Sequence, residues 1–92
     1  MTADAVDQSF DEILDWLTER VAFYLDRSPE DIDPGVPLAE YGVDSVYVVS
    51  VFGEVEERYS LSVDPTAAWD HPTLDALAKH LHERLVAPDG PV

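Results

Sequence analysis

The chain has 92 residues, which is room for one small domain. Its 5 basic and 20 acidic residues give a formal net charge of −15. This charge excludes nucleic acids and anionic membrane surfaces as partners. Hydrophobic residues make up 46% of the chain, too many for an acidic disordered tail, and cysteine is absent. Disulfides and thiolate metal sites are therefore excluded, and we expect the acidic residues on the surface of a folded domain.

The ends of the chain show no targeting pattern. Residues 1–12 carry no basic side chain and no apolar run, and no segment approaches the roughly 20 apolar residues that span a bilayer. We therefore expect a cytoplasmic protein. Residues 1–8 and 87–92 are expected to be flexible tails around a domain at 9–86. Short tails of this kind suit a freestanding protein and a domain excised from a longer chain equally.

Residues 9–26 carry the clearest helical pattern. Ser9 with Glu12 three residues later has the spacing of a capping box, which marks a helix start. The apolar side chains after it recur with a period of 3.6 residues: Phe10, Ile13, Leu14, Leu17, Val21, Tyr24 and Leu25.

A long connection follows at 27–43, where Pro29, Pro34 and Pro37 rule out a continuous helix. Loops of this length are uncommon in small domains and are usually functional. Four spaced apolar residues are expected to anchor this loop to the core: Ile32, Val36, Leu38 and Tyr41.

Residues 45–59 are ambiguous, because their many β-branched residues favour a strand. The apolar positions do not alternate, however, and Asp44 is a good helix N-cap. Five of the apolar residues fit one helical face, so we predict a helix: Val48, Val51, Phe52, Val55 and Tyr59.

The last third of the chain predicts one short and one long helix. Asp64 caps a single turn at 64–69 with Pro65 at its first position, and a helix starting near Thr73 carries a clean apolar stripe. Three long helices and one short one make an all-α, antiparallel-type four-helix bundle. We expect its core to contain Ile13, Leu17, Val21, Leu38, Val48, Phe52, Val55, Trp69, Leu74, Leu77 and Leu81.

Ser45 is the candidate functional residue. It ends the long loop and begins a helix, where backbone N–H groups and the positive end of the helix dipole favour a phosphate on its hydroxyl. On position alone, an ordinary polar residue at a helix start is by far the commoner explanation, because serine and aspartate are frequent there. An acidic surface is expected around it, because the 30 residues between Arg27 and Arg58 contain eight acids and no base.

The motif around this serine resembles that of acyl carrier proteins of the polyketide synthase type. The resemblance covers nearly the whole chain and rests on three stretches: the proline-containing loop at 31–38, the closing motif at 69–74 with 77–81, and Tyr41-Gly42-Val43-Asp44-Ser45-Val46. One departure is Val46, because leucine usually follows the serine in this family. Asp44 and the closing motif favour an acyl carrier over a peptidyl carrier.

The resemblance implies a non-catalytic carrier. Ser45 would receive 4′-phosphopantetheine from coenzyme A through a phosphopantetheinyl transferase, and the arm's thiol would carry acyl or polyketide intermediates as thioesters. A ketosynthase, an acyltransferase or acyl-activating enzymes would then dock on a monomeric carrier. The implied docking surface comprises Asp44, Val46, Tyr47, Ser50, Gly53, Glu54 and Glu57.

Alternative functions are weighed against this one. A peptidyl carrier of a peptide synthetase and an unmodified acidic adaptor remain open. An esterase is disfavoured, because valines rather than glycines flank Asp44-Ser45. No metal site is expected: the residues from Asp31 lack the glycine and glutamate of a calcium loop, and His80 and His82 point to different helix faces. We also expect Trp69 in the core, Tyr47 half exposed and no deep permanent cavity between the helices.

Overall fold

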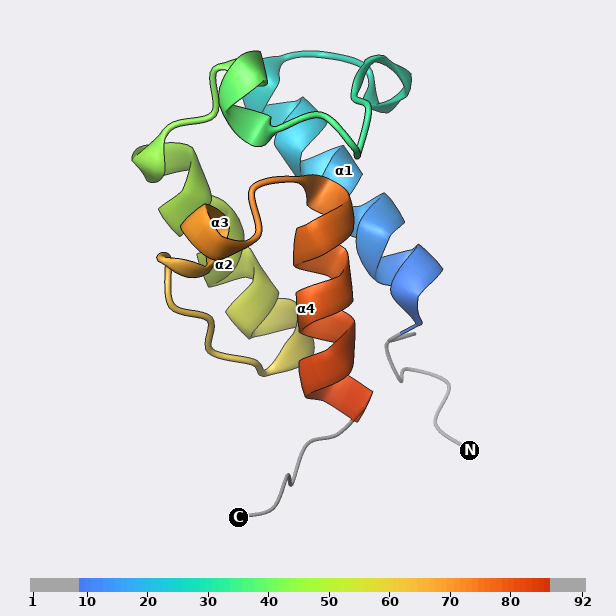
Figure 1. Ribbon diagram of the computed structural model, residues 1–92, viewed down its shortest axis with the longest axis vertical. Coiled ribbons are helices and arrows are strands. Elements are labelled where there is room, and N and C mark those ends of the chain that lie inside the picture. The colour runs from blue at the N-terminus through green and yellow to red at the C-terminus, as the bar shows by residue number, and fades with distance from the viewer. Residues whose placement is uncertain (1–8, 87–92) are drawn as a thin grey trace.

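The computed structural model describes residues 9–86 and shows a small helical bundle (Figure 1). Its helices are α1 (Phe10–Leu25), α2 (Ser45–Tyr59), α3 (Ala67–Asp70) and α4 (Leu74–Val86). Helix α1 runs antiparallel to both α2 and α4, and the short α3 lies beside α2 (Figure 1). Three long helices and one short one, with no strand in residues 9–86, confirm the predicted all-α class. The expected tails at 1–8 and 87–92 lie outside the described residues.

The N-termini of the long helices form as their sequences predict. The Ser9 hydroxyl accepts a hydrogen bond from the Glu12 backbone N–H at 3.3 Å, and the Thr73 hydroxyl accepts one from the Ala76 N–H at 3.1 Å. These bonds satisfy donors that a helix start leaves unpaired. The predicted short helix is displaced: Asp64 holds a turn by accepting from the Thr66 N–H at 2.9 Å, and α3 begins only afterwards.

The long loop is ordered by two short 3₁₀ helices that the proline pattern did not reveal. They are η1 (Pro29–Asp31) and η2 (Leu38–Tyr41). A 3₁₀ turn tolerates proline at its start, so residues that exclude a long α-helix still permit it. The expected anchoring is confirmed for three of the four residues: Ile32 and Leu38 are buried in the core, and Tyr41 packs against it. Val36 is half-buried but is not among the residues packed against the core.

Backbone hydrogen bonds fix this loop to the start of α4. The Leu38 N–H donates to the Pro72 carbonyl at 2.9 Å, and the Asp75 N–H donates to the Pro34 carbonyl at 3.0 Å. These hydrogen bonds hold the loop, and with it the beginning of α2, in a defined position.

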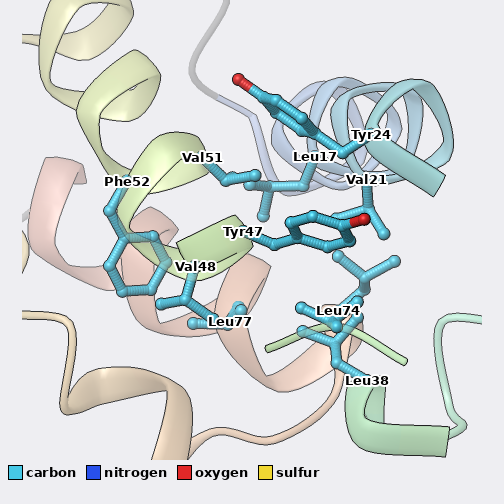
Figure 2. A pocket seen from close by; sticks show the side chains of 11 residues that line it. Leu17, Val21, Tyr24, Leu38, Tyr47, Val48, Val51, Phe52, Leu74 and Leu77 are labelled. Carbon is cyan, nitrogen blue, oxygen red and sulfur yellow. The ribbon is translucent and has the colours of Figure 1, made fainter. Parts of the chain in front are cut away.

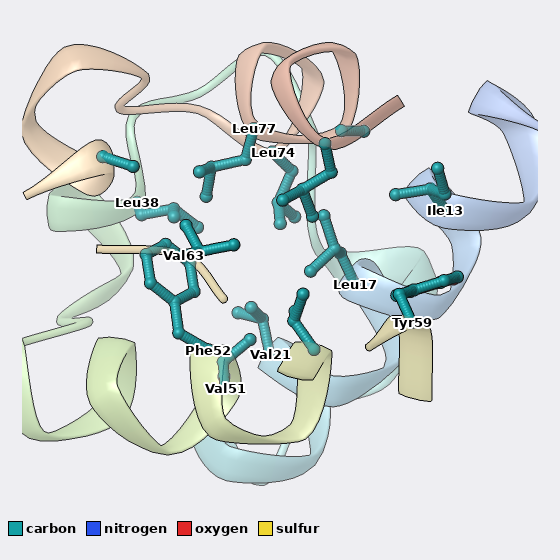
Figure 3. Close-up of a cluster of buried hydrophobic side chains, with 14 of the residues drawn as sticks. Ile13, Leu17, Val21, Leu38, Val51, Phe52, Tyr59, Val63, Leu74 and Leu77 are labelled. Carbon is teal, nitrogen blue, oxygen red and sulfur yellow. The ribbon is translucent and has the colours of Figure 1, made fainter. Parts of the chain in front are cut away.

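The core lies between α1, α2 and α4 (Figure 3). Ile13, Leu17, Val55 and Leu81 are fully buried, and nine of the eleven predicted core residues are buried. Val48 is only half-buried but packs against the core. Seven buried residues are missing from the predicted core: Ala22, Ile32, Val51, Tyr59, Val63, Ala67 and Ala78. Val51 and Tyr59 nevertheless lie on the apolar face predicted for residues 45–59, and Ile32 was expected to anchor the loop.

The prediction for Trp69 was wrong, because its exposed fraction is 76%. Helix α3 is a single turn, and its one buried residue is Ala67. Two residues along an α-helix correspond to a rotation of roughly 200°, so a turn that buries Ala67 directs Trp69 away from the core. With only four residues, α3 has no second apolar face that could bury Trp69.

Candidate functional site

Ser45 is the first residue of α2 and is exposed to solvent. The chain reaches it through Gly42, which ends η2 with a φ of 85°. This is the left-handed region that glycine adopts readily and that side chains with a Cβ disfavour. The Gly42 N–H also donates to the Ala39 carbonyl at 3.1 Å, so the sharp turn that presents Ser45 is fixed.

Asp44 caps the helix on which Ser45 sits. Its Oδ1 accepts from the backbone N–H groups of Val46 and Tyr47, both at 3.1 Å. This confirms the predicted N-cap. Asp44 occupies two of the N–H donors at the helix start, so fewer of them are free to bind a phosphate on Ser45 than the sequence suggested.

The seven predicted docking residues all reach the surface of the bundle. Asp44, Val46, Gly53 and Glu57 are exposed, while Tyr47, Ser50 and Glu54 are half-buried. Their surface differs from the sequence expectation in one respect: Val49 is 55% exposed beside Val46, which is 68% exposed. The sequence already indicated this exposure, because Val49 falls outside the apolar face predicted for residues 45–59.

Glu54 is tied to α1 rather than free. Its carboxylate accepts a hydrogen bond from the Tyr24 hydroxyl and lies 2.7 Å from the Nε of Arg20. The hydrogen bond to Glu54 raises the pKa of Tyr24, because the carboxylate favours the protonated phenol. Tyr47 stacks on Tyr24 with ring centroids 6.0 Å apart. Of the predicted docking acids on α2, Glu57 therefore presents the freer charge.

The interior beneath Tyr47 is nearly filled. Figure 2 shows this ring lying between Leu17 and Val21 of α1 and Leu74 of α4, where a space of about 20 Å³ remains. That volume is close to the minimum needed for a single water molecule. Half-burial of Tyr47 is as predicted, and this part of the bundle has no room for a bound chain.

A larger hollow of about 230 Å³ opens beside Ser45, between α2 and α3. Here the expectation of no cavity between the helices is wrong in part, because the short α3 covers α2 incompletely. The lining is mainly apolar and includes Ser45 itself: Leu38, Ala39, Val43, Asp44, Ser45, Val48, Pro65, Thr66, Ala68, Trp69 and Pro72.

Other site classes find no support within residues 9–86. No group of three or more His, Asp or Glu side chains there could hold a metal ion, and no helix in that range is long and apolar enough to cross a membrane. His71 and His80 instead stack on each other, with ring centroids 4.3 Å apart.

The chain matches known carrier domains. A family model described as a phosphopantetheine attachment site covers residues 15–81. A phenolphthiocerol/phthiocerol polyketide synthase from Mycobacterium tuberculosis is 35% identical over 75 residues, which are 82% of this chain and 4% of that protein. The chain therefore spans a small part of this much longer relative.

Solved carrier proteins of similar size share both sequence and fold. A freestanding peptidyl carrier protein from Acinetobacter baumannii has a TM-score of 0.83 at 34% identity, covering 86% of this chain and 99% of that one. Acyl carrier protein LipD from Actinoplanes friuliensis has a TM-score of 0.70 at 37% identity, covering 92% and 97%. The chain belongs to the family of carrier domains that bear a covalent 4′-phosphopantetheine group.

Proposed function

We propose that Ser45 is the attachment point and that the chain carries acyl or polyketide intermediates. When attached, the arm supplies a terminal thiol that holds acyl groups as thioesters. The exposed hydroxyl of Ser45, directly after the capping Asp44 and inside the matched range 15–81, is the observation that carries this proposal. The residues fit the group, because Asp44 holds the helix end while the neighbouring hollow leaves space around the hydroxyl.

The chain's own residues position the arm and do no chemistry on its cargo. The loop anchored by Leu38 and the turn at Gly42 hold Ser45 at the edge of the bundle. We therefore propose that residues 9–86 act as a non-catalytic, monomeric carrier in the cytoplasm, where coenzyme A supplies the arm. Rigid presentation of one exposed hydroxyl suits a transferase that must reach it and enzymes that must reach the arm afterwards.

The proposed partners are a phosphopantetheinyl transferase, a ketosynthase, and an acyltransferase or acyl-activating enzyme. The curated relative with polyketide synthase in its name supports this choice. Asp44, Val46, Tyr47, Ser50, Gly53, Glu54 and Glu57 form the proposed docking surface. Three of its seven residues are acidic, and no base occurs between Arg27 and Arg58. This surface fits partners whose docking sites are basic, and we expect association to weaken as salt rises.

A peptidyl carrier is the second candidate, favoured by the similarity to the freestanding peptidyl carrier from Acinetobacter baumannii. The two candidates share the arm and differ in cargo. The protein that already bears the arm is incubated with an acyl-activating enzyme and, in parallel, with an amino-acid-activating enzyme. This experiment distinguishes the two candidates. Transfer of acyl groups alone supports the acyl carrier, and transfer of amino acids alone supports the peptidyl carrier.

The attachment site is tested by incubating the protein with coenzyme A, Mg²⁺ and a transferase of broad specificity, followed by intact-mass analysis. We expect a gain of one phosphopantetheinyl unit in the native protein and in Ser28→Ala, which changes an exposed serine outside the proposed docking surface. Ser45→Ala should gain nothing. An unchanged mass for the folded native protein favours the unmodified acidic adaptor and contradicts the proposal.

A further inference from the structure

Both carboxylate oxygens of Glu54 are engaged by side chains of α1. Its Oε1 lies 2.7 Å from the Nε of Arg20, and its Oε2 accepts a hydrogen bond from the Tyr24 hydroxyl. The side chains of Arg20 and Glu54 are 29% and 31% exposed, so a docking enzyme can still reach the pair. Glu57, three residues further along α2, is exposed and forms no ion pair within residues 9–86. These two acids of the proposed docking surface therefore present unequal charges.

Aromatic rings of α1 hold the Arg20 guanidinium in this ion pair. Its Cζ lies 4.7 Å from the ring centroid of Phe23 and 5.8 Å from that of Tyr24. Attraction between a cation and the face of an aromatic ring favours one position of a side chain that is otherwise mobile at a surface. Phe23 is 66% exposed and lies outside the core, so the support of Arg20 gives this exposed phenylalanine a structural role.

We propose that Arg20 weakens the docking of basic partner enzymes by holding Glu54 in an internal ion pair. The inference rests on the docking surface of the proposed function. A guanidinium or ammonium group of the partner must compete with Arg20 for the carboxylate, and the charge of Arg20 also repels that group. Removal of this arginine should therefore strengthen docking.

The position of the ion pair favours a role in docking over a role in stability. A partly exposed ion pair contributes little to the free energy of unfolding, whereas a charge at the rim of an interface changes the rate and the salt dependence of association. Glu54 lies on the proposed docking surface, and Tyr47 of the same surface stacks on Tyr24 with ring centroids 6.0 Å apart. The α1 side chains that engage Glu54 therefore border the docking surface itself.

The test uses a phosphopantetheinyl transferase, because its reaction also reports whether the arm is attached. Initial rates of loading from coenzyme A, measured at several carrier concentrations and low ionic strength, give kcat and KM for each variant. Arg20→Gln removes the charge of the pair. Lys79→Gln is the matched control, because it removes one positive charge from an exposed residue of α4 outside the docking surface. Circular dichroism shows whether each variant is folded.

We expect Arg20→Gln to lower KM by about two- to fivefold, the range that corresponds to an exposed charge pair, with kcat unchanged. Glu54→Gln should raise KM, because it leaves Arg20 unopposed. The double variant, which lacks both charges, should return KM to the native value. Lys79→Gln should leave KM nearly unchanged. The gain in Arg20→Gln should shrink as NaCl is added, since salt screens exposed charges.

Three outcomes overturn the inference but leave the carrier function intact. The first is a normally loaded Arg20→Gln protein whose KM equals the native value. The second is a higher KM for this variant, which would show that Arg20 itself contacts the partner. The third is an equal fall in KM for Lys79→Gln, which would assign the effect to net charge alone.

A failure of the proposed function would look different. A folded native protein that gains no arm contradicts the attachment and, with it, the inference. If Arg20→Gln fails to fold, Phe23→Leu removes the ring that holds Arg20 without changing any charge. This variant should lower KM to a smaller extent, and an unchanged KM would overturn the inference.

Discussion

The α1–α4 side of the bundle and the α2–α3 side are built differently. On the first side, Ile13, Leu17 and Leu81 are fully buried. On the second side, α3 buries only Ala67, a hollow of about 230 Å³ remains and Trp69 is exposed. The contrast indicates a division of roles, in which the packed faces of α1, α2 and α4 supply most of the stability and the α3 side keeps accessible surface next to Ser45.

The largest difference between the two sides should appear in core truncations. Leu81→Ala should lower the free energy of unfolding by about 2–5 kcal/mol, because it leaves a cavity in a fully buried position. Trp69→Ala in the unmodified protein should change it by no more than about 0.5 kcal/mol, as is usual for surface positions. Urea denaturation followed by circular dichroism measures both. Equal losses for the two variants would show that α3 shares the core.

A smaller effect is expected at the helix caps, where two aspartates can be compared. Asp44→Ala should cost about 1 kcal/mol, because two N–H donors of the 15-residue α2 lose their acceptor. Asp64→Ala should cost less, since Asp64 caps only the turn before the four-residue α3. Asp44→Asn is the control that retains a capping oxygen. A larger loss for Asp64→Ala would place more stability on α3 and the turn before it than the structure indicates.

The stability of the fold should depend on pH through His80 of α4, which stacks on His71 at the end of α3. Burial, the stacked His71 and the nearby Arg84 lower the pKa of His80 from 6.5, while Glu83 and Asp70 act in the opposite direction. Because the folded pKa lies below the unfolded value, His80 contributes stability above pH 6.5 that is lost as the pH falls through the folded pKa.

Unfolding free energies measured from about pH 7.5 to about pH 5.5 test this expectation. The native protein should lose stability across that range, and His80→Gln should lose less. His82→Gln is the matched histidine control on the same helix. If the native protein gained stability on acidification while His80→Gln did not change, folding would not lower the pKa of His80.

Among these predictions, the smallest expected effect is that of salt on the melting temperature. Twenty acidic residues against five basic ones repel each other in the folded state, so moderate NaCl should raise the melting temperature as the Debye length falls to about 8 Å near physiological ionic strength. The ion pairs Arg20–Glu54 and Arg58–Glu12 weaken in salt, but partly exposed pairs contribute little. A melting temperature that falls with added NaCl would show that these pairs outweigh the repulsion.

Local signals in the sequence predicted most of the fold. The Ser9 and Asp44 caps and the apolar stripes placed α1, α2 and α4, because capping oxygens and helical periodicity act over a few residues. The two 3₁₀ helices and the start of α3 were not predicted, since single turns leave too few residues for a period. Exposure of Trp69 depends on how far α3 extends, which is a property of the packed bundle.

Ser45 and its seven docking neighbours stay predictions, which follow from the motif and from the helix predicted at 45–59. Three features required the structure: Asp44 occupying the N–H groups expected for a phosphate, Glu54 tied to Arg20 and Tyr24, and the hollow beside Ser45. Each of these depends on side-chain contacts that spacing alone does not fix.

The carrier assignment is tested most directly by locating the arm on the chain. Trypsin cuts after Arg27 and Arg58 and releases one peptide, 28–58, that holds Ser28, Ser45 and Ser50. After loading with coenzyme A and a transferase, fragmentation of this peptide in a mass spectrometer should place one phosphopantetheinyl unit on Ser45. An unmodified peptide from a folded protein, or an arm on Ser28 or Ser50, would contradict the assignment.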